Sequence, residues 1–261
     1  MPESLIESPL APGIVRLTLN RPEQRNALDR ALIEALAAAI AHHATLASTR
    51  VLLIAGAGSA FCAGADLAAM RALGRASYPE NLADARRLAD LLAALHDCPK
   101  PSIACVHGAA YGGGLGLVAA CDVAIAAADA RFRLPEVRLG LAPAVISPYL
   151  LEAIGPRQAR RYALSGEAID AECARRIGLV HEVLAADALD AAALALATEI
   201  ASGGQAALAV TKTLLGEARR VERAASTAER TAHVLAELRA GPEAQEGLEA
   251  AIERRRPRWV G

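Results

Sequence analysis

The sequence predicts an α/β fold followed by a helical C-terminal region. Short apolar runs rich in β-branched residues recur along the chain, and amphipathic helical patterns lie between them. Strands that alternate with helices in this way are typical of an α/β architecture. After about residue 200 the strand-like runs stop and only helical patterns follow. We therefore expect a core over residues 1–200 and a helical region over residues 201–261.

The expected strands are short, and each ends in glycine or a polar turn. They are GIVRLTLN (13–20), RVLLIAGAG (50–58), PSIACVHGAA (101–110) and CDVAIAAAD (121–129). Apolar residues recur every three or four positions from Leu28 to Ala44 and around residues 81–97, as on one face of a helix. Three further helical segments are expected at 205–220, 227–240 and 242–256.

The composition argues against several classes of protein. The 261 residues are 54% hydrophobic, which is enough for a sizeable core. A net charge of −1 with 3% aromatic residues gives little support for nucleic-acid binding. The N-terminus lacks the basic patch and apolar stretch of a signal peptide, so we expect a cytosolic protein. Five scattered cysteines without a CxxC pair suggest neither a disulfide framework nor a metal site.

The segment GAGSAFCAGADL (56–67) follows the second expected strand. It begins like a dinucleotide-binding fingerprint, but it lacks the third glycine and an acidic residue about 20 positions further on. The motifs GxxxxGK[ST], HExxH and GxSxG do not occur in the sequence. Taken alone, the segment favours a strand-to-helix turn with Asp66 as the helix cap over a chemical role.

The octet AYGGGLGL (110–117) places four glycines where a helix is expected to start. Each glycine in an ordered element costs roughly 0.5–1 kcal/mol relative to alanine, so stability does not explain the cluster. A glycine-rich helix entrance exposes N–H groups that can hold a negative oxygen, and close helix–sheet packing is the alternative. Because two such loops each follow a strand, each could direct one N–H at the same oxygen, as in stabilisation of an enolate or of a tetrahedral oxyanion.

Glu136 follows Pro135 and stands among mostly apolar residues. A carboxylate in a partly apolar site has a raised pKa, which suits a general acid or base near neutral pH. An exposed glutamate paired with Arg133 or Arg138 is the alternative, and this segment alone does not choose between them.

Taken together, these stretches resemble the crotonase, or enoyl-CoA hydratase/isomerase, superfamily over nearly the whole chain. The resemblance rests on LNRPEQRNALDRALIEAL (19–36), AFCAGADL (60–67), KPSIACVHGAAYGGGLGL (100–117), CDVAIAAADARFRLPEVRLGL (121–141) and GPEAQEGLEAAIERRRPRW (241–259). Within the superfamily, the chain is most similar to bacterial methylglutaconyl-CoA hydratases of leucine and acyclic-terpenoid catabolism. The resemblance implies a spiral of ββα units with a C-terminal helical assembly region, as homotrimers or homohexamers.

The resemblance also implies an acyl-CoA thioester substrate, with no cofactor beyond its CoA moiety. The thioester oxygen would lie between the backbone N–H groups of Ala65 and Gly113. The residues along the CoA path would be Arg25, Ala27, Ala63, Asp66 and Leu67. Arg25 would contact a phosphate, and Lys212 is a further candidate for such a contact.

The superfamily pattern and this chain differ at one position. The best-known hydratase pattern has two glutamates, of which Glu136 matches one, whereas Gly116 stands where the other is expected. The leading hypothesis is hydration of a 2-enoyl-CoA with Glu136 as acid and base. A Δ3,Δ2-enoyl-CoA isomerase that uses Glu136 alone is the nearest alternative, and a non-catalytic acyl-CoA or RNA-binding protein is another. For a substrate with a distal carboxylate, the candidate partners are Arg71, Arg75, Arg86 and Arg87.

Overall fold

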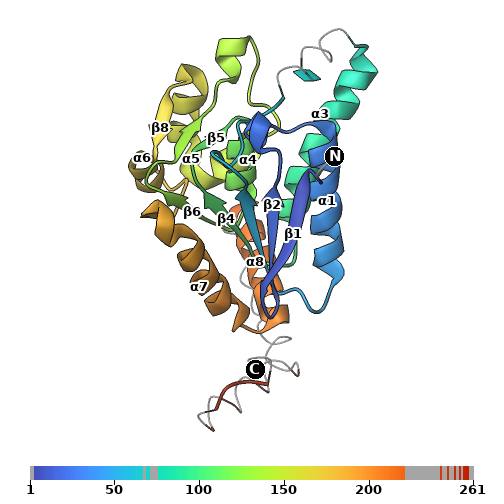
Figure 1. Cartoon of the computed structure of the whole chain (residues 1–261), viewed down its shortest axis with the longest axis vertical. Helices are drawn as coiled ribbons and strands as arrows, with labels where there is room; N and C mark the ends of the chain where they lie inside the picture. The colour runs from blue at the N-terminus through green and yellow to red at the C-terminus, as the bar shows by residue number, and fades with distance from the viewer. Residues whose placement is uncertain are drawn as a thin grey trace.

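The computed structural model describes residues 3–66, 69–70 and 76–220, together with residues 242, 246, 250, 253 and 255–258. Within this part of the chain, helices pack on two β-sheets (Figure 1). The larger sheet has the strand order β1-β2-β3-β4-β6-β9, and the smaller has the order β5-β7-β8. This arrangement confirms the α/β fold.

The strands of the larger sheet are β1 (Leu5–Ala11), β2 (Ile14–Leu19), β3 (Val51–Gly56), β4 (Ser102–Val106), β6 (Val123–Ala127) and β9 (Glu182–Leu184). Those of the smaller sheet are β5 (Ala109–Tyr111), β7 (Arg131–Arg133) and β8 (Ala168–Asp170). β1 runs antiparallel to β2, and the other neighbours in the larger sheet run parallel. The expected apolar runs correspond to β2, β3, β4 with β5, and β6.

The main helices are α1 (Arg30–Thr45), α3 (Tyr78–His96), α4 (Gly113–Ala120), α5 (Ser147–Ser165), α6 (Ala171–Arg176), α7 (Leu189–Ala201) and α8 (Gln205–Arg220), with 3-10 turns η1 (Pro22–Gln24), η2 (Glu136–Leu139) and η3 (Ala186–Ala188). Three of the described helices, α1, α3 and α6, begin after a residue whose side chain caps the first turn. Asp29 caps α1 by accepting a hydrogen bond from the Leu32 N–H at 2.8 Å. Ser77 and Glu80 form a capping box at the start of α3.

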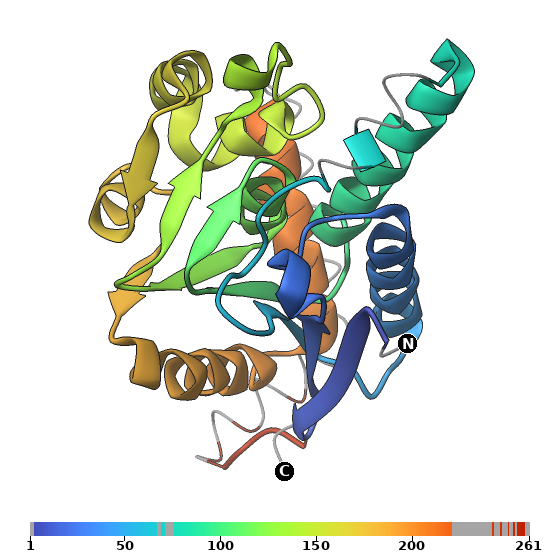
Figure 2. The ribbon, with the colours of Figure 1, turned by 45° about the horizontal axis from the view of Figure 1, so that its top comes forward.

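The two faces of the larger sheet are covered by different helices. Alternate residues of a strand point to opposite faces. Val51 and Leu53 of β3 pack with α7, whereas Leu52 and Ile54 pack with the cluster that contains α1, α3 and α4. Figure 2 shows α7 and the α1–α3 pair on opposite sides of the strands. Burial on both faces explains why β3 reads as a continuous apolar run.

A repeated strand–strand–helix path builds the molecule. Isolated parallel bridges join Leu28 to Ala65 and Cys62 to Ala110, and β5 pairs in parallel with β7. Successive turns of chain therefore pass through the larger sheet, through the layer of the smaller sheet and then into a helix. The units β4–β5–α4 and β6–β7–α5 follow this path, which is the expected ββα spiral.

The apolar runs do not predict β1, β7, β8 or β9. β1 contains Pro9 and lies at the edge of the larger sheet, where a residue without an N–H is tolerated. The pairing of β1 with β2 also shifts register between Pro9 and Ala11. β7, β8 and β9 have three residues each, which is too short for a recognisable alternating pattern.

The helical C-terminal region begins with α8, whose bounds are those expected. The segment expected at 227–240 lies outside the described residues, whereas residues 242, 246, 250 and 253 of the next segment are helical. Division of the chain at residue 200 stays a prediction. In the described part of the chain, no single helix is long and apolar enough to span a membrane. Residues Ala186–Ala201 and Gln205–Gly216, which meet at an angle of 101°, have the length and composition of a broken span only when taken together.

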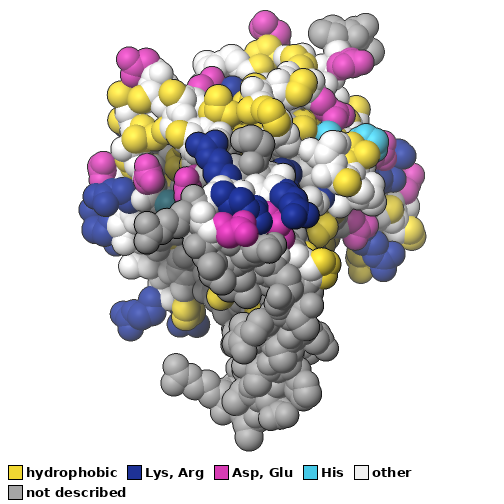
Figure 3. Space-filling model, turned by 90° about the horizontal axis from the view of Figure 1, so that it is seen from below, with side chains coloured by type: hydrophobic (Ala, Val, Ile, Leu, Met, Phe, Trp, Pro, Cys, Tyr) yellow, Lys and Arg dark blue, Asp and Glu magenta, His cyan; other side chains and the backbone are white. Residues whose placement is uncertain are grey.

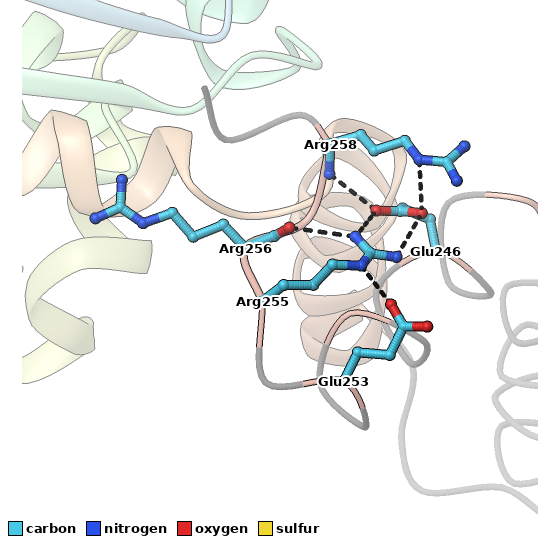
Figure 4. Close-up of polar contacts among 5 residues, drawn as sticks. All are labelled: Glu246, Glu253, Arg255, Arg256 and Arg258. Atoms are coloured by element: carbon cyan, nitrogen blue, oxygen red, sulfur yellow. Dashed lines mark hydrogen bonds and ion pairs between the residues drawn. The ribbon is translucent and has the colours of Figure 1, made fainter.

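Glu246 organises the described residues near the C-terminus. Arg255 Nη1 lies 2.6 Å from Glu246 Oε1, and the Arg258 N–H donates to the same oxygen at 2.9 Å (Figure 4). Arg255 Nε also donates to Glu253. The hydrogen bond from Arg255 lowers the pKa of Glu246 to about 2. On the face seen in Figure 3, basic and acidic side chains likewise lie next to one another.

Candidate active site

The structure brings the two glycine-containing loops together. The Cys62 N–H donates to Ala109 O at 2.9 Å, and the Tyr111 N–H donates to Cys62 O at 3.0 Å. A Cβ on Gly114 would lie only 2.8 Å from Cys62 Cβ, so this glycine serves close packing of the two loops. Close packing at the glycine-rich helix entrance and the approach of the two loops to each other therefore occur together and are not alternatives.

Each loop carries a backbone N–H, that of Ala65 or of Gly113, for which the structure gives no acceptor among the described residues. Around Ala65, the Leu28 N–H donates to Gly64 O at 2.7 Å and the Asp66 N–H donates to Leu28 O at 3.1 Å. This parallel bridge uses the neighbours of Ala65, so the N–H of Ala65 itself points the other way. Gly113 is the first residue of α4, and its N–H has no acceptor within the helix. Among the described residues, neither N–H has a hydrogen-bond acceptor.

Glu136 lies at the entrance of α4. It is the first residue of η2, and a Cβ on Gly112 would lie 3.0 Å from Glu136 Oε1. Glu136 Oε2 is buried and has no hydrogen-bond partner among the described residues. Burial raises the pKa of Glu136 above its ordinary value. A carboxyl group in this state can take up and release a proton near neutral pH more readily than an exposed glutamate.

The arginines beside Glu136 point elsewhere. Arg133 Nε donates to Gly166 O at 2.8 Å, and Arg138 Nη2 donates to Ser165 O at 3.2 Å. Among the described residues, neither forms an ion pair with Glu136. The alternative of an exposed, ion-paired glutamate is therefore wrong.

Gly116 lies where a side chain has no room. A Cβ at this position would lie 3.1 Å from Ile146 Cβ and 3.5 Å from Leu92 Cδ1, with Ile146 Cγ2 nearer still. Ile146 precedes α5 and is buried, as is Leu92 of α3. The place beside Gly116 is thus filled by aliphatic groups, which the local sequence around position 116 did not reveal.

The residues expected along the CoA path lie around the first loop. Arg25 is exposed, and its carbonyl accepts the Ala63 N–H at 2.9 Å. Asp66 Oδ1 accepts the Ala69 N–H at 3.1 Å, so Asp66 caps a helix start as expected. Ala27 O accepts a hydrogen bond from Arg21 Nη1. Leu67 lies outside the described residues.

Asn26 and Arg21, which no sequence pattern singled out, connect the segments around the first loop. Asn26 is fully buried, donates from Nδ2 to Ala57 O and Ala60 O, and accepts the Arg21 N–H on Oδ1. Arg21 Nη2 lies 3.1 Å from Asp29 Oδ2 and 3.5 Å from Asp66 Oδ2. Both stand in the motif LNRPEQRNALDRALIEAL (19–36), which was the available signal, but three of their partners, Ala57, Ala60 and Asp66, lie 31 to 45 residues away.

Lys212 lies away from the two loops. Its Nζ is 2.8 Å from Asp122 Oδ2. Asp122 follows the C-terminus of α4, whereas Gly113 is at the N-terminus of that helix. Asp122 Oδ2 also accepts hydrogen bonds from Ser102 N and Oγ. The structure therefore gives Lys212 of this chain a role in attaching α8 and does not support a phosphate contact.

The structure describes two of the four arginines that were considered as partners for a distal carboxylate. Arg87 lies 3.3 Å from Glu34 Oε1 and 3.8 Å from Asp84 Oδ1, so it faces α1. Arg86 is exposed, half a helical turn from Leu88 on α3. Arg71 and Arg75 lie outside the described residues.

Neither thiol nor metal chemistry is suggested here. Cys62 is fully buried, and burial raises the pKa of its thiol to about 12, so it stays protonated. In the described part of the chain, no group of three or more His, Cys, Asp or Glu side chains could hold a metal ion. Among the described residues, the groups that could act on a substrate here are the Glu136 carboxyl group and the backbone N–H groups of Ala65 and Gly113.

Such a site, on a ββα spiral, defines an enzyme class that polarises a carbonyl oxygen and moves a proton beside it. The sequence pattern described as enoyl-CoA hydratase/isomerase matches residues 10–261. The chain belongs to this family and is an enzyme of its hydratase class.

Named relatives cover nearly the whole chain. The 2,3-dehydroadipyl-CoA hydratase of Escherichia coli is 38% identical over 250 residues, 95% of each chain. The mevalonyl-coenzyme A hydratase sidH of Aspergillus fumigatus is 36% identical over 252 residues, 95% of this chain and 92% of the relative. The crystal structure of an enoyl-CoA hydratase from Shewanella pealeana matches with a TM-score of 0.94 at 39% identity, covering 98% of this chain and 96% of that one.

Proposed function

We propose that this enzyme adds water across the 2,3 double bond of a 2-enoyl-CoA, with Glu136 as acid and base. One observation carries the proposal: Glu136 Oε2, which has no hydrogen-bond partner among the described residues, lies beside the helix entrance where the Gly113 N–H likewise has no acceptor in that part of the chain. The hydratase names of the relatives support the reaction class.

In the proposed reaction the thioester oxygen accepts hydrogen bonds from the Ala65 and Gly113 N–H groups. This polarisation makes C3 electrophilic. Glu136 takes a proton from water, the hydroxyl oxygen bonds to C3, and the electron pair of the double bond moves through C2 onto the thioester oxygen. Glu136 then returns the proton to C2, directly or through a second water. One such N–H donor contributes about 2.7–4 kcal/mol to lowering the barrier.

We propose that the CoA moiety passes along the first loop. Arg25 offers an exposed guanidinium for a phosphate, and Ala27, Ala63 and Asp66 border the same surface. Leu67 is proposed as a neighbour on the family resemblance alone. We also propose that the enzyme is cytosolic and that it assembles as a homotrimer or homohexamer. Analytical ultracentrifugation would test the assembly.

The acyl group is proposed to be methylglutaconyl or a similar branched or dicarboxylic enoyl group. Relatives named for mevalonyl-CoA and 2,3-dehydroadipyl-CoA support this range. Steady-state hydration of 3-methylglutaconyl-CoA against crotonyl-CoA is the measurement. A clear preference for crotonyl-CoA would remove the narrower proposal while leaving the reaction intact.

A Δ3,Δ2-enoyl-CoA isomerase is the second candidate, because Gly116 leaves Glu136 as the acid/base group at this site. Such an enzyme would shuttle one proton between C2 and C4. Product analysis in ¹⁸O-labelled water separates the two: incorporation of the label marks hydration, and migration of the double bond without label marks isomerisation. Tight binding without either product would favour a non-catalytic acyl-CoA protein.

The role of Glu136 is tested by Glu136→Gln. The amide keeps the shape but cannot take a proton from water, so kcat/KM for hydration should fall by about 10²–10⁴-fold. Glu172→Gln, at an exposed glutamate paired with Arg175, is the control and should leave the rate unchanged. Near-wild-type hydration by Glu136→Gln would show that Glu136 is not the base.

A further inference from the structure

Aliphatic side chains from three elements meet the bare backbone of α4. Gly113 and Gly116 lie one turn apart, on the same face of the helix. A Cβ on Gly113 would lie 2.9 Å from Leu28 Cδ1 and 3.9 Å from Leu88 Cδ2, and one on Gly116 would meet Ile146. The wall beside the proposed oxyanion donor is therefore apolar along a full helical turn.

Ile146 is the part of this wall that is most firmly placed. It is 3% exposed, stands at the N-cap of α5 and contacts the backbone of α4 directly at Gly116. Its branched Cβ restricts the side-chain torsion, so the position of its methyl groups is fixed by the backbone and the packing. The side chain carries no polar atom and can neither donate nor accept a proton.

Along α4, the contacts of Glu136 and Ile146 stand before and after Gly113. The Glu136 carboxylate faces Gly112, one residue before the N–H donor, whereas Ile146 faces Gly116, three residues after it. Both contacts therefore fall within about one helical turn of the proposed donor along the chain. In a 2-enoyl thioester, C3 lies only two bonds from the carbonyl carbon, so a thioester held at Gly113 would have C3 close to this part of the helix.

We propose that Ile146 is a specificity-determining residue that bounds the acyl group at C3, so that the site takes 2-enoyl thioesters with a small apolar substituent, such as methyl, on that carbon. The proposal rests on the proposed function, which places the thioester oxygen at Gly113. Water delivered by Glu136 then reaches C3 from one side, and Ile146 covers the substituent on the other.

The test compares two thioesters that differ by one methylene at C3. These are 3-methylcrotonyl-CoA and (Z)-3-methyl-2-pentenoyl-CoA, in which the ethyl group takes the place of the C3 substituent and the methyl group takes the place of the chain. The wild-type enzyme should prefer the smaller substrate, and Ile146→Val should reduce that preference in kcat/KM roughly tenfold, as expected for one methylene in an apolar pocket. Ile154→Val is the matched control, because Ile154 is also buried on α5 and loses the same methylene.

A preference that is unchanged in Ile146→Val, or that shifts equally in Ile154→Val, would overturn the proposal. Hydration of crotonyl-CoA by the wild type keeps this outcome separate from failure of the proposed function. Should the wild type hydrate none of the three thioesters, the proposed function fails first and the inference fails with it.

A second pair of variants tests the contact itself. Gly116→Ala places a methyl group against Ile146, so its hydration rate should fall, with folding checked by circular dichroism. Ile146→Ala in that background removes the obstruction and should restore at least about tenfold in kcat/KM, because contacting residues couple strongly. A double variant no more active than Gly116→Ala would contradict the proposal.

Discussion

At the scale of single residues, Glu136 is held in a state that opposes the stability of the fold. Its Oε2 is buried without a partner among the described residues, and burial raises its pKa. A carboxylate oxygen that is buried without a hydrogen-bond donor is unfavourable, and such groups are concentrated at functional sites. The fold therefore keeps Glu136 ready for a proton at the expense of some stability.

Glu136→Gln should raise the melting temperature near neutral pH. The pKa of Glu136 is raised in the folded state, so the contribution of its protonated form is fully present below the unfolded pKa and is lost as the pH rises through the folded pKa. The advantage of the amide should therefore be largest at pH 7–8 and vanish below about pH 4. Thermal unfolding across this range measures it, with Glu172→Gln as control. A melting temperature lowered at pH 7 would contradict the burial argument.

Gly112→Ala should disable the site more than it destabilises the fold. The φ of Gly112 is +48°, a conformation that side chains rarely adopt, and the new Cβ would lie 3.0 Å from Glu136 Oε1. The backbone strain costs on the order of 1–3 kcal/mol, and the carboxylate must also move. We expect a lower melting temperature. We also expect kcat for hydration to fall by more than the loss of stability explains.

Gly155→Ala separates these two effects. Gly155 has a φ of +70° at the kink of α5, and nothing lies within 4 Å of its added Cβ. It should lower the melting temperature similarly and leave kcat nearly unchanged. Equal losses of kcat in both variants would mean that strain, and not displacement of Glu136, causes the effect.

Some site residues could be predicted from the sequence, and others could not. Glu136 and Gly113 stand in local patterns, a glutamate among apolar residues and a glycine-rich helix entrance, whose chemistry follows from neighbours in the chain. Ile146 and Asn26 act through partners remote in sequence, Gly116 for the first and Ala57 for the second. Their side chains look like ordinary core and turn residues until the packing is known.

At the scale of elements, three segments are joined beside the site. Asn26 attaches the turn after η1 to the loop after β3, and Arg21 lies between Asp29 at the start of α1 and Asp66 at the end of that loop. The position of the Ala65 N–H therefore depends on the side chains of Asn26 and Arg21 as well as on the loop itself.

Asn26→Ala should destabilise the fold by on the order of 2 kcal/mol or more, because two carbonyls and one N–H lose their partners. Urea unfolding and the KM for enoyl-CoA measure the two consequences, and we expect KM to rise.

Asn26→Asp is the informative control for this prediction. The φ of Asn26 is +57°, which aspartate also tolerates, but a carboxylate cannot donate to Ala57 O and Ala60 O. Asn26→Asp should therefore be at least as damaging as Asn26→Ala. Tolerance of aspartate would show that only the backbone conformation matters at this position.

The strands show how far element prediction reaches. β3 and β4 are buried on both faces, so their composition alone marks them. β1 exposes most of its residues and contains Pro9, and its pairing with β2 defines it as a strand. Edge strands of this kind depend on a partner that local sequence does not show.

At the scale of the whole molecule, Lys212 joins the described part of α8 to the core. Lys212 binds Asp122, which Ser102 of β4 also holds, and Arg50 donates to the carbonyls of Ala201 and Gly203, where α7 ends and the connection to α8 follows. Between α8 and the core lies a hollow of about 670 Å³ that Lys212, His96 and Leu215 help to line. The Lys212–Asp122 pair is thus one of the contacts that hold α8 beside this hollow.

Lys212→Met should loosen α8 more than it lowers overall stability. The two side chains are 16% and 29% exposed, so loss of the pair should cost no more than about 1 kcal/mol. Limited proteolysis with mass mapping should show earlier cleavage within 201–220. Arg175→Gln, which breaks the exposed pair with Glu172, is the control and should leave the cleavage pattern unchanged. Identical cleavage of all three proteins would contradict this role.

The parallel bridge between Leu28 and Ala65 gives the length of the preceding loop a chemical meaning. Successive N–H groups of an extended segment point in opposite directions. If one residue between β3 and Cys62 were deleted and a bridge to Leu28 were kept, the bridge would form one residue further along the chain. The N–H of residue 65 would then point towards Leu28, and a neighbouring N–H would point outwards. The proposed oxyanion donor is thus specified by a count of residues, and any side chain small enough for position 65 could carry it.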